Sequence, residues 1–222
     1  MMMKRAAFAW DSATKPDWYG TIASKVQAIK AAGVSHVWLP PPSQSVSAQG
    51  YMPGQLYNLN SKYGQVEDLK QLTMALNAAG LSPMADIVIN HRCADEKGPD
   101  GKWNAFRDDV THRGHKIDWG KWAITGNDPD FGGTGNPDTG DDYGPAPDLD
   151  HANPQLREAL KDWLTWLAED LGFRGWRLDF ARGYAAKYAA EYIAASLPPG
   201  SVCVGEYWTD LKWNGPNLDI NQ

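Results

Sequence analysis

The sequence has few cysteines, no excess of positive charge and no long apolar run. Only two cysteines, Cys93 and Cys203, occur in 222 residues, which excludes a disulfide framework. No apolar stretch approaches the length of a membrane span, so we expect no membrane partner. The first residues, MMMKRAAFAWDS, lack the long apolar segment of a signal peptide. These absences predict a soluble protein whose cellular location stays open.

Basic residues are outnumbered by acidic ones. The chain has 21 Lys and Arg against 27 Asp and Glu, which gives a net charge of -6. A nucleic-acid partner would require a basic stripe, so this class of function is excluded. The sequence also has no internal repeat and no low-complexity tract.

Aromatic residues are plentiful by contrast. The chain contains 11 Trp and 9 Tyr. Their flat faces can pack in a hydrophobic core, and they can also stack on the C–H faces of sugar rings. Composition alone favours the core and leaves the second use open.

Apolar periodicity predicts strands and helices in alternation, which is typical of a parallel sheet with crossover helices. Gly33, Gly80 and Gly172 end three of the helical patterns, and Asn153 with Pro154 begins the third. The expected strands are 8–10, 34–40, 84–90, 173–180 and 201–208, and the expected helices are 18–32, 69–79, 154–171 and 184–197.

Two α/β folds remain, the open doubly wound sheet and the (β/α) barrel. A doubly wound sheet would carry a glycine-rich phosphate turn after its first strand, where this chain has DSATKPDW. In a barrel, functional residues lie at the carboxyl ends of the strands. Three successive strands end in Asn90-His91, in Arg177 with Asp179, and in Glu206. The barrel is therefore favoured.

A segment of about 60 residues, 91–153, separates the third strand from the next helix, and loops of this length are usually functional. Its densest part, GNPDTGDDYGPAPDLDH, is rich in Asp with little Lys or Arg to offset the charge. Ca²⁺ prefers oxygen ligands in irregular geometry, so a calcium site is one explanation. A solvated acidic loop is the other, and the spacing does not decide between them.

Arg177 and Asp179 lie two positions apart in the apolar run GFRGWRLDF, hence on one face of a strand. Asp179 and Glu206 at neighbouring strand ends could form the carboxylate pair of a retaining glycosidase. Arg177 would then hold Asp179 ionised, Glu206 would have a raised pKa, and His91 could hydrogen-bond a sugar hydroxyl. A buried structural ion-pair cluster explains the same residues equally well.

These segments also resemble a known family. DIVINHR (86–92), GWRLDFARGY (175–184) and VGEYW (204–208) are similar to conserved blocks of alpha-amylases of glycoside hydrolase family 13. HVWLPPPSQSVSAQGYMPGQLYNL and SKYGQVEDLK resemble the plant-type branch. The resemblance runs from about Phe8 to Trp208. It implies a (β/α)8 barrel and a calcium-binding, retaining endo-hydrolase of α-1,4-glucans such as starch, from a family whose members are often secreted.

The resemblance assigns roles to individual residues. It implies that Asp179 is the nucleophile, that Glu206 is the acid/base and that Arg177 positions the nucleophile. His91 and Tyr51 match substrate-binding residues, Tyr51 as a stacking aromatic. Met52, Trp10 and Arg182 are further implied to bind substrate.

The resemblance also implies calcium ligands. A second calcium position expects an Asp near 127, where this chain has Asn127-Asp128, and a third, around 107–118, is poorly reproduced by RDDVTHRGHKID. The implied ligands are the side chains of Asn90, Asp138 and Asp148, the carbonyls of Asp141 and Gly183, and, at the second position, Asp142 with the carbonyls of Tyr143 and Ala146.

Residues 1–90 and 154–222 are thus expected to form a partial catalytic barrel, and 91–153 an inserted calcium-binding loop like the family's domain B. Five of the eight strand units of such a barrel are present, and the family's fourth block, which carries a further Asp, is absent. We expect open sheet edges, and hence either a longer natural chain or self-association, with weak activity of residues 1–222 alone. Three functions stay open: an alpha-amylase, a transglycosidase of the same family, and a non-catalytic glucan-binding remnant.

Overall fold

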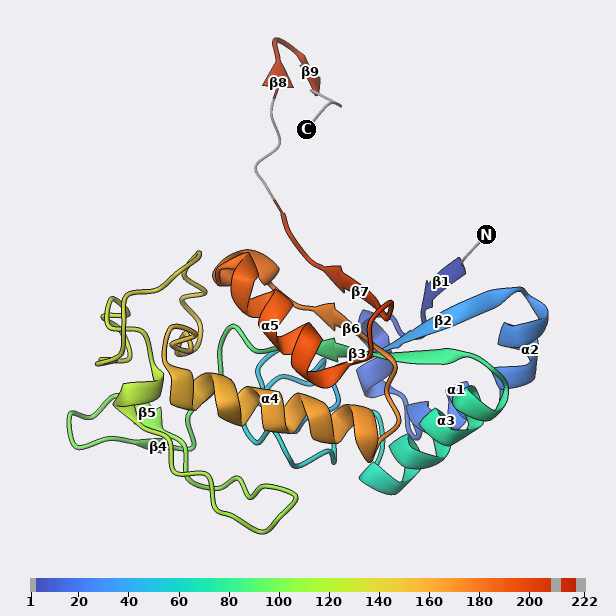
Figure 1. The fold of residues 1–222 in the computed structure, drawn as a ribbon, viewed down its shortest axis with the longest axis horizontal. Coiled ribbons are helices and arrows are strands. Elements are labelled where there is room, and N and C mark those ends of the chain that lie inside the picture. Colours follow the sequence, from blue (N-terminus) through green and yellow to red (C-terminus); the bar gives the residue numbers. More distant parts are fainter. Residues whose placement is uncertain (1–2, 209–212, 219–222) are drawn as a thin grey trace.

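The computed structural model describes residues 3–208 and 213–218, and its centre is a five-stranded parallel sheet (Figure 1). The strand order is β1-β2-β3-β6-β7, so each strand pairs with the one that precedes it in this sheet along the chain. The order confirms the predicted parallel sheet and four of its five predicted strands. Their bounds are β1 (Met3–Ala6), β2 (Val34–Leu39), β3 (Ser82–Ile87), β6 (Gly175–Leu178) and β7 (Val202–Gly205).

Helices connect and cover these strands. The helix α4 shows why: Asn153 caps it by accepting a hydrogen bond from the Gln155 N–H, Pro154 begins it, and an apolar stripe that includes Leu160 and Trp163 is buried. In Figure 1, α4 and α5 lie side by side on one part of the sheet. The helices are α1 (Trp18–Ala23), α2 (Val26–Ala31), α3 (Val66–Ala78), α4 (Pro154–Glu169) and α5 (Ala186–Ser196), with short 3-10 turns η1 (Trp10–Thr14), η2 (Lys121–Ala123) and η3 (Ala181–Gly183). No helix in residues 3–208 and 213–218 is long and apolar enough to cross a membrane.

Two sequence-based expectations about the first 33 residues are wrong. The first strand is Met3–Ala6 and not 8–10. The segment MKRA forms a sheet edge, which needs no apolar run, and Trp10 begins η1. The single helix expected over 18–32 is two helices. At the break, the Ser24 hydroxyl donates to the Thr21 carbonyl, a local bond that competes with continued helix.

The sheet does not close on itself within the described residues. There, β1 is paired only with β2, and β7 only with β6. The short strands β8 (Trp213–Asn214) and β9 (Asn217–Leu218) pair with each other in a separate hairpin. Both edges of the main sheet therefore carry unpaired backbone groups in this part of the chain.

The segment 91–153 has little regular structure and lies beside one end of the sheet (Figure 1). It contains the two-stranded β4 (Glu96–Lys97) and β5 (Trp103–Ala105). Its end returns to the sheet, because the Leu149 N–H donates to the Asn90 carbonyl at 2.8 Å. The acidic stretch is thereby held against the end of β3.

The tryptophans differ widely in burial. Trp163 and Trp176 are fully buried in the core, whereas Trp10 and Trp208 are 71% and 68% exposed. The exposed pair lies near the carboxyl ends of the strands, where the site described below is found.

Candidate active site

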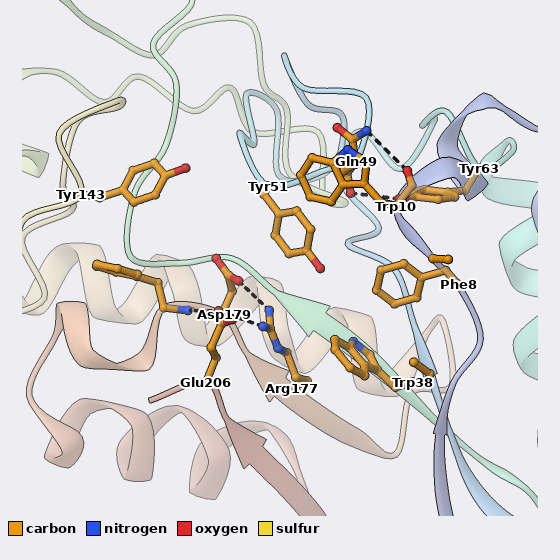
Figure 2. Close-up of a pocket in the computed structure, with 13 residues that line it drawn as sticks. Phe8, Trp10, Trp38, Gln49, Tyr51, Tyr63, Tyr143, Arg177, Asp179 and Glu206 are labelled. Carbon is orange, nitrogen blue, oxygen red and sulfur yellow. Dashed lines mark hydrogen bonds and ion pairs between the residues drawn. The ribbon is translucent and has the colours of Figure 1, made fainter. Parts of the chain in front are cut away.

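The carboxyl ends of β3, β6 and β7 meet at one rim of the sheet, next to a cavity of about 510 Å³. Figure 2 shows Arg177, Asp179 and Glu206 on one side of it, with Tyr51 and Trp10 above them. Its wall is mainly aromatic and is formed by Ala6, Phe8, Ala9, Trp10, Trp38, Gln49, Tyr51, Tyr63, Tyr143, Arg177, Asp179, Phe180 and Glu206.

Arg177 joins the two predicted catalytic carboxylates. Its Nη1 lies 2.5 Å from Asp179 Oδ1, and its Nη2 lies 2.8 Å from Glu206 Oε2. The strand register explains this arrangement. Arg177 of β6 is paired with Val204 of β7, and Asp179 and Glu206 each lie two residues further along. The sheet thus brings together all three residues that the sequence predicted as catalytic.

Phe180 turns the chain sharply after Asp179. It has φ 42° and ψ 48°, a left-handed conformation that is strained for a bulky residue. The turn lets the Phe180 N–H donate to Glu206 Oε2 at 3.3 Å. On the other side of this carboxylate, the Trp208 indole N–H donates to Oε1 at 2.7 Å.

A further carboxylate, Asp86, lies beneath Arg177 and was missed from the sequence. It is completely buried in β3, where it is paired with Arg177, and accepts a hydrogen bond from Arg177 Nη1 at 2.8 Å. Asp86 is the one charged residue in the predicted strand 84–90, and that was the available signal. A lone charge in a strand buried on both faces requires a partner.

The third carboxylate changes the proton distribution expected of the pair. Burial, and then the charge of Asp86, raise the pKa of Asp179 to about 7, although Arg177 opposes them. Burial alone would raise the pKa of Glu206, but the Trp208 indole N–H and the Arg177 charge outweigh it and lower that pKa. Arg177 was expected to keep Asp179 ionised, but burial and the charge of Asp86 outweigh it. Glu206 was expected to have a raised pKa, but the hydrogen bond from Trp208 and the charge of Arg177 lower it.

Tyr51 and Trp10 form an aromatic surface over the carboxylates. Their rings are nearly parallel, at 10°, with centroids 6.4 Å apart. The Tyr51 hydroxyl donates to Asp86 Oδ2 at 3.0 Å. Both residues line the cavity, as their predicted substrate-binding role requires.

His91, Met52 and Arg182 are not on the wall of this cavity. His91 is fully buried and stacks on Tyr143 with centroids 3.6 Å apart, and burial lowers the pKa of its imidazole to about 4, which keeps it neutral. Met52 accepts a hydrogen bond from the Tyr143 hydroxyl and lines a neighbouring cavity. Arg182 pairs with Asp141 and donates to the Trp208 carbonyl at 2.7 Å.

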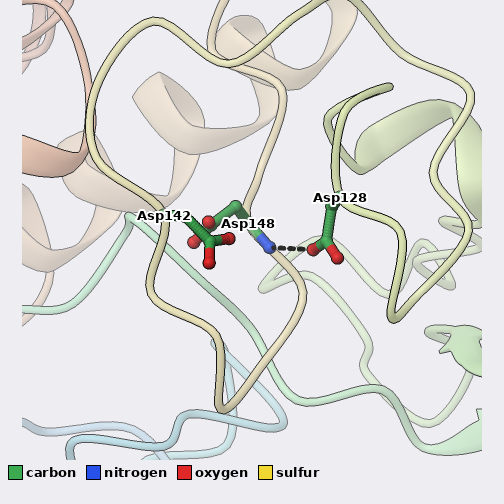
Figure 3. A group of neighbouring side chains, drawn as sticks. All are labelled: Asp128, Asp142 and Asp148. Atoms are coloured by element: carbon green, nitrogen blue, oxygen red, sulfur yellow. Dashed lines mark hydrogen bonds between the residues drawn. The ribbon is translucent and has the colours of Figure 1, made fainter.

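Three carboxylates gather in the acidic segment (Figure 3). One oxygen each from Asp128, Asp142 and Asp148 lies within 4.8 Å of the others. Burial and the neighbouring acids raise the pKa of Asp148 to about 8. Asp128 was not among the predicted ligands, although an acid was expected one position earlier, where Asn127 stands.

The other predicted ligands surround this cluster unevenly. Asn90 Nδ2 donates to Asp148 Oδ1 at 2.7 Å, whereas its buried Oδ1 has no hydrogen-bond partner among the described residues. Gly183 packs against that oxygen so closely that a Cβ there would collide with it.

The remaining predicted ligands have other partners. Asp138 accepts a hydrogen bond from the Thr139 N–H, and the Asp141 carboxylate accepts one from Arg182. The Tyr143 backbone N–H donates to Asp148, and Ala146 is buried.

This donor set fits a hard divalent cation. The convergent atoms are carboxylate oxygens, which Ca²⁺ prefers, and Asn90, which contacts Asp148, has a buried amide oxygen without a partner among the described residues. A buried amide oxygen without a partner is costly unless something binds it. The residues present therefore fit calcium, with Asn90, Asp128, Asp142 and Asp148 as the side chains able to hold it.

Comparison with known proteins identifies the class. The alpha-amylase catalytic-domain family matches residues 9–196, so the chain belongs to the alpha-amylase family. It is 40% identical over 215 residues to chloroplastic alpha-amylase 3 of Arabidopsis thaliana and 41% identical over 216 residues to probable alpha-amylase 2 of the same plant. Each match covers 97% of this chain but only 23% and 49% of those relatives. The chain thus spans at most about half the length of the two.

Solved structures confirm the fold class. An alpha-amylase from Geobacillus thermoleovorans, in a complex with acarbose, matches with a TM-score of 0.60 at 22% identity, over 94% of this chain and 46% of that one. A cyclomaltodextrin glucanotransferase named CldA matches with a TM-score of 0.66 at 20% identity, over 88% and 44%. The parallel sheet and its helices therefore correspond to part of a (β/α)8 barrel fold.

Proposed function

We propose that this chain carries the catalytic carboxylates of an alpha-amylase, which hydrolyses α-1,4-glucosidic bonds with retention. The observation that carries the proposal is Arg177, whose two terminal nitrogens contact Asp179 and Glu206 beside an aromatic cavity. Such a carboxylate pair on adjacent strand ends suits a double displacement at an anomeric carbon. Residues 1–90 and 154–222 would supply the barrel part, and 91–153 the inserted calcium-binding segment.

The proposed reaction has two steps. An Asp179 oxygen attacks the anomeric carbon while the Glu206 carboxyl gives its proton to the departing glycosidic oxygen, which leaves a glycosyl ester on Asp179. Glu206 then takes a proton from water, and that water replaces Asp179 at the same carbon. Arg177 holds both carboxylates in place, and Tyr51 with Trp10 offers a flat surface to a glucose ring.

Substrate binding has to move a proton in this scheme. Without substrate, the proton is favoured on Asp179, because its pKa is raised while that of Glu206 is lowered. The first step needs the opposite arrangement. The two carboxyls lie within hydrogen-bonding reach of one another, so the proton can pass between them directly.

The pH dependence of turnover tests this proton distribution. The first step needs one proton on the carboxyl pair, and the pair loses that proton as pH rises through the raised pKa of Asp179, about 7. We expect kcat/KM on an α-linked maltooligosaccharide to fall about tenfold per pH unit above about pH 7. A fall that begins near pH 4, the ordinary carboxyl range, would show that the pair does not hold its proton more tightly than a free carboxyl.

Alpha-amylase activity itself is tested by product analysis. Starch incubated with the protein should yield new reducing ends of α configuration, seen by NMR before mutarotation. Products longer than the added maltooligosaccharide would instead indicate transfer to sugar in place of water. Binding of glucan without any turnover would indicate a non-catalytic protein.

Calcium is proposed to tie the acidic segment to the barrel through Asn90, Asp128, Asp142 and Asp148. The ion would offset carboxylates that otherwise repel each other and would satisfy the free Asn90 oxygen. Chelation should lower Tm, by roughly 5–10 °C, and should open residues 91–153 to proteolysis, because a ligand bound only by the folded state adds stability. Magnesium added back serves as the control and should restore less. An unchanged melting curve in excess chelator would refute a structural calcium.

We also propose that a second copy of the chain can pair along the open sheet edges. Within the described residues, β1 and β7 each have one neighbour, and exposed edges are templates for strand addition. Light scattering should then give a mass that rises above 24.5 kDa with concentration. A monomer at every concentration would remove this proposal and leave the catalytic one intact.

A further inference from the structure

Asp86 collects three hydrogen bonds from three different elements. Arg177 of β6 donates Nη1–H to Oδ1 at 2.8 Å. The Tyr51 hydroxyl, from the segment after β2, donates to Oδ2 at 3.0 Å, and Trp38 Nε1–H of β2 donates to the same oxygen at 3.1 Å. All three donors belong to residues that line the cavity, whereas Asp86 itself is completely buried beneath them.

Arg177 also lies over the rings of the other two donors. The Arg177 guanidinium carbon lies 5.1 Å from the centre of the Trp38 ring and 5.9 Å from that of Tyr51. These are cation–π distances. One buried carboxylate therefore fixes the guanidinium that holds the catalytic pair and the aromatic ring proposed to receive the sugar.

We infer that Asp86 is a positioning residue, which sets the aromatic surface at Tyr51 in register with the carboxylates held by Arg177. The inference rests on the proposed function, because it concerns the same cavity. Asp86 acts through its neighbours and does not touch the substrate. Both the pocket for the sugar and the charge of the catalytic pair should depend on it.

The charge of Asp86 supports the second part. It competes with Asp179 for Arg177 and raises the pKa of Asp179 by repulsion, after the larger effect of burial. Removing that charge should lower the pKa of Asp179, because Arg177 then serves fewer carboxylates. The titratable groups that face Asp179 from the packed elements are Asp86, Arg177, Glu206, Tyr51, Tyr143 and Tyr184.

Asp86→Asn is the informative variant. An Asn side chain at this position has one acceptor oxygen where the carboxylate uses two. If that oxygen serves Arg177, the amide N–H₂ faces the Trp38 indole N–H, which cannot accept. If it serves Tyr51 and Trp38, the amide faces the guanidinium. Either way one donor loses its partner and the ring or the arginine is released.

Asp109→Asn is the matched control. Asp109 is also a buried carboxylate paired with a buried arginine, Arg92, but it does not line the cavity. It controls for the loss of a buried charge and for reduced stability. Tyr51→Phe is the second variant, which frees only the aromatic ring from Asp86.

Two readouts decide the inference: the pKa of Asp179 from ¹³C NMR of its labelled carboxyl, and the affinity for maltoheptaose from calorimetry. Asp86→Asn should lower that pKa and weaken maltoheptaose binding about tenfold, as loss of a well-placed hydrogen bond does. Tyr51→Phe should weaken binding several-fold. Asp109→Asn should lower Tm and leave both readouts unchanged.

The outcomes separate this inference from the proposed function. If Asp86→Asn has the affinity and the Asp179 pKa of the wild type, Asp86 has a structural role only. If Asp86→Asn does not fold, unaltered binding by Tyr51→Phe overturns the inference. If the wild type itself does not bind maltoheptaose, the proposed function fails, and the carboxyl titration alone decides whether Asp86 controls Asp179.

Discussion

Asp179→Asn should abolish glucan hydrolysis, with a loss of kcat on the order of 10⁴-fold or more. The amide cannot form the glycosyl ester, and among the described residues Glu206 is the only other carboxylate on the wall of the cavity. The fold should survive. Because burial raises the pKa of Asp179 to about 7, above the ordinary value of about 3.9, protonation favours the folded state. That contribution is lost as pH rises through about 7, so the neutral amide should raise Tm slightly at pH 8.

Glu206→Gln is the matched control for this loss. It should fail on starch, whose leaving group needs a proton, yet retain activity on an α-glucoside with an activated leaving group. Asp179→Asn should fail on both substrates. If Asp179→Asn retained more than a trace of hydrolysis, the assignment of the nucleophile would be wrong.

Arg92→Met should destabilise the protein by about 3–5 kcal/mol, since it leaves a buried carboxylate without its cation. Arg92 is completely buried, donates Nε–H to the Gly54 carbonyl at 2.6 Å, and lies 3.3 Å from Asp109. Its guanidinium carbon also lies 5.1 Å from the centre of Phe106 and 4.9 Å from that of Trp119. These contacts fasten the inserted segment to the end of β3. The Tm of the variant should fall by roughly 10 °C.

Arg107→Met controls for the loss of an arginine from the same segment. Arg107 forms ion pairs with Asp118 at 2.6 Å and Glu96 at 3.6 Å, but all three side chains are largely exposed. Its removal should cost less than about 1 kcal/mol. Equal destabilisation by Arg92→Met and Arg107→Met in urea unfolding would show that the buried contacts do not fasten the segment.

The site residues that could be placed from the sequence are those at the ends of parallel strands. Carboxyl ends of neighbouring parallel strands share one rim, so Arg177, Asp179 and Glu206 could be placed together from their positions alone. Asp86 was missed because an acid inside an apolar strand gives no spacing signal, and its three donors come from distant segments. The raised pKa of Asp179 comes first from burial and then from the charge of Asp86, and neither could be weighed from the sequence.

Apolar periodicity mispredicted the elements that depend on contacts with other parts of the chain. The edge strand Met3–Ala6 has no apolar run, and it is held by backbone pairing with β2 that its own sequence does not indicate. The break between α1 and α2 interrupts a continuous apolar pattern. Asp128 joined the carboxylate cluster in place of the acid expected one position earlier, because a loop conformation without regular period placed it there.

The central claim is that Asp179 forms a covalent bond to the sugar. An activated fluorosugar of the α-glucosyl class should react with the protein and leave a glycosyl adduct that accumulates, and peptide mass spectrometry locates it. We expect the added mass on the peptide that contains Asp179, on that residue alone, and none in Asp179→Asn. An adduct on Glu206 or another carboxylate, or no adduct under conditions of turnover, would contradict it.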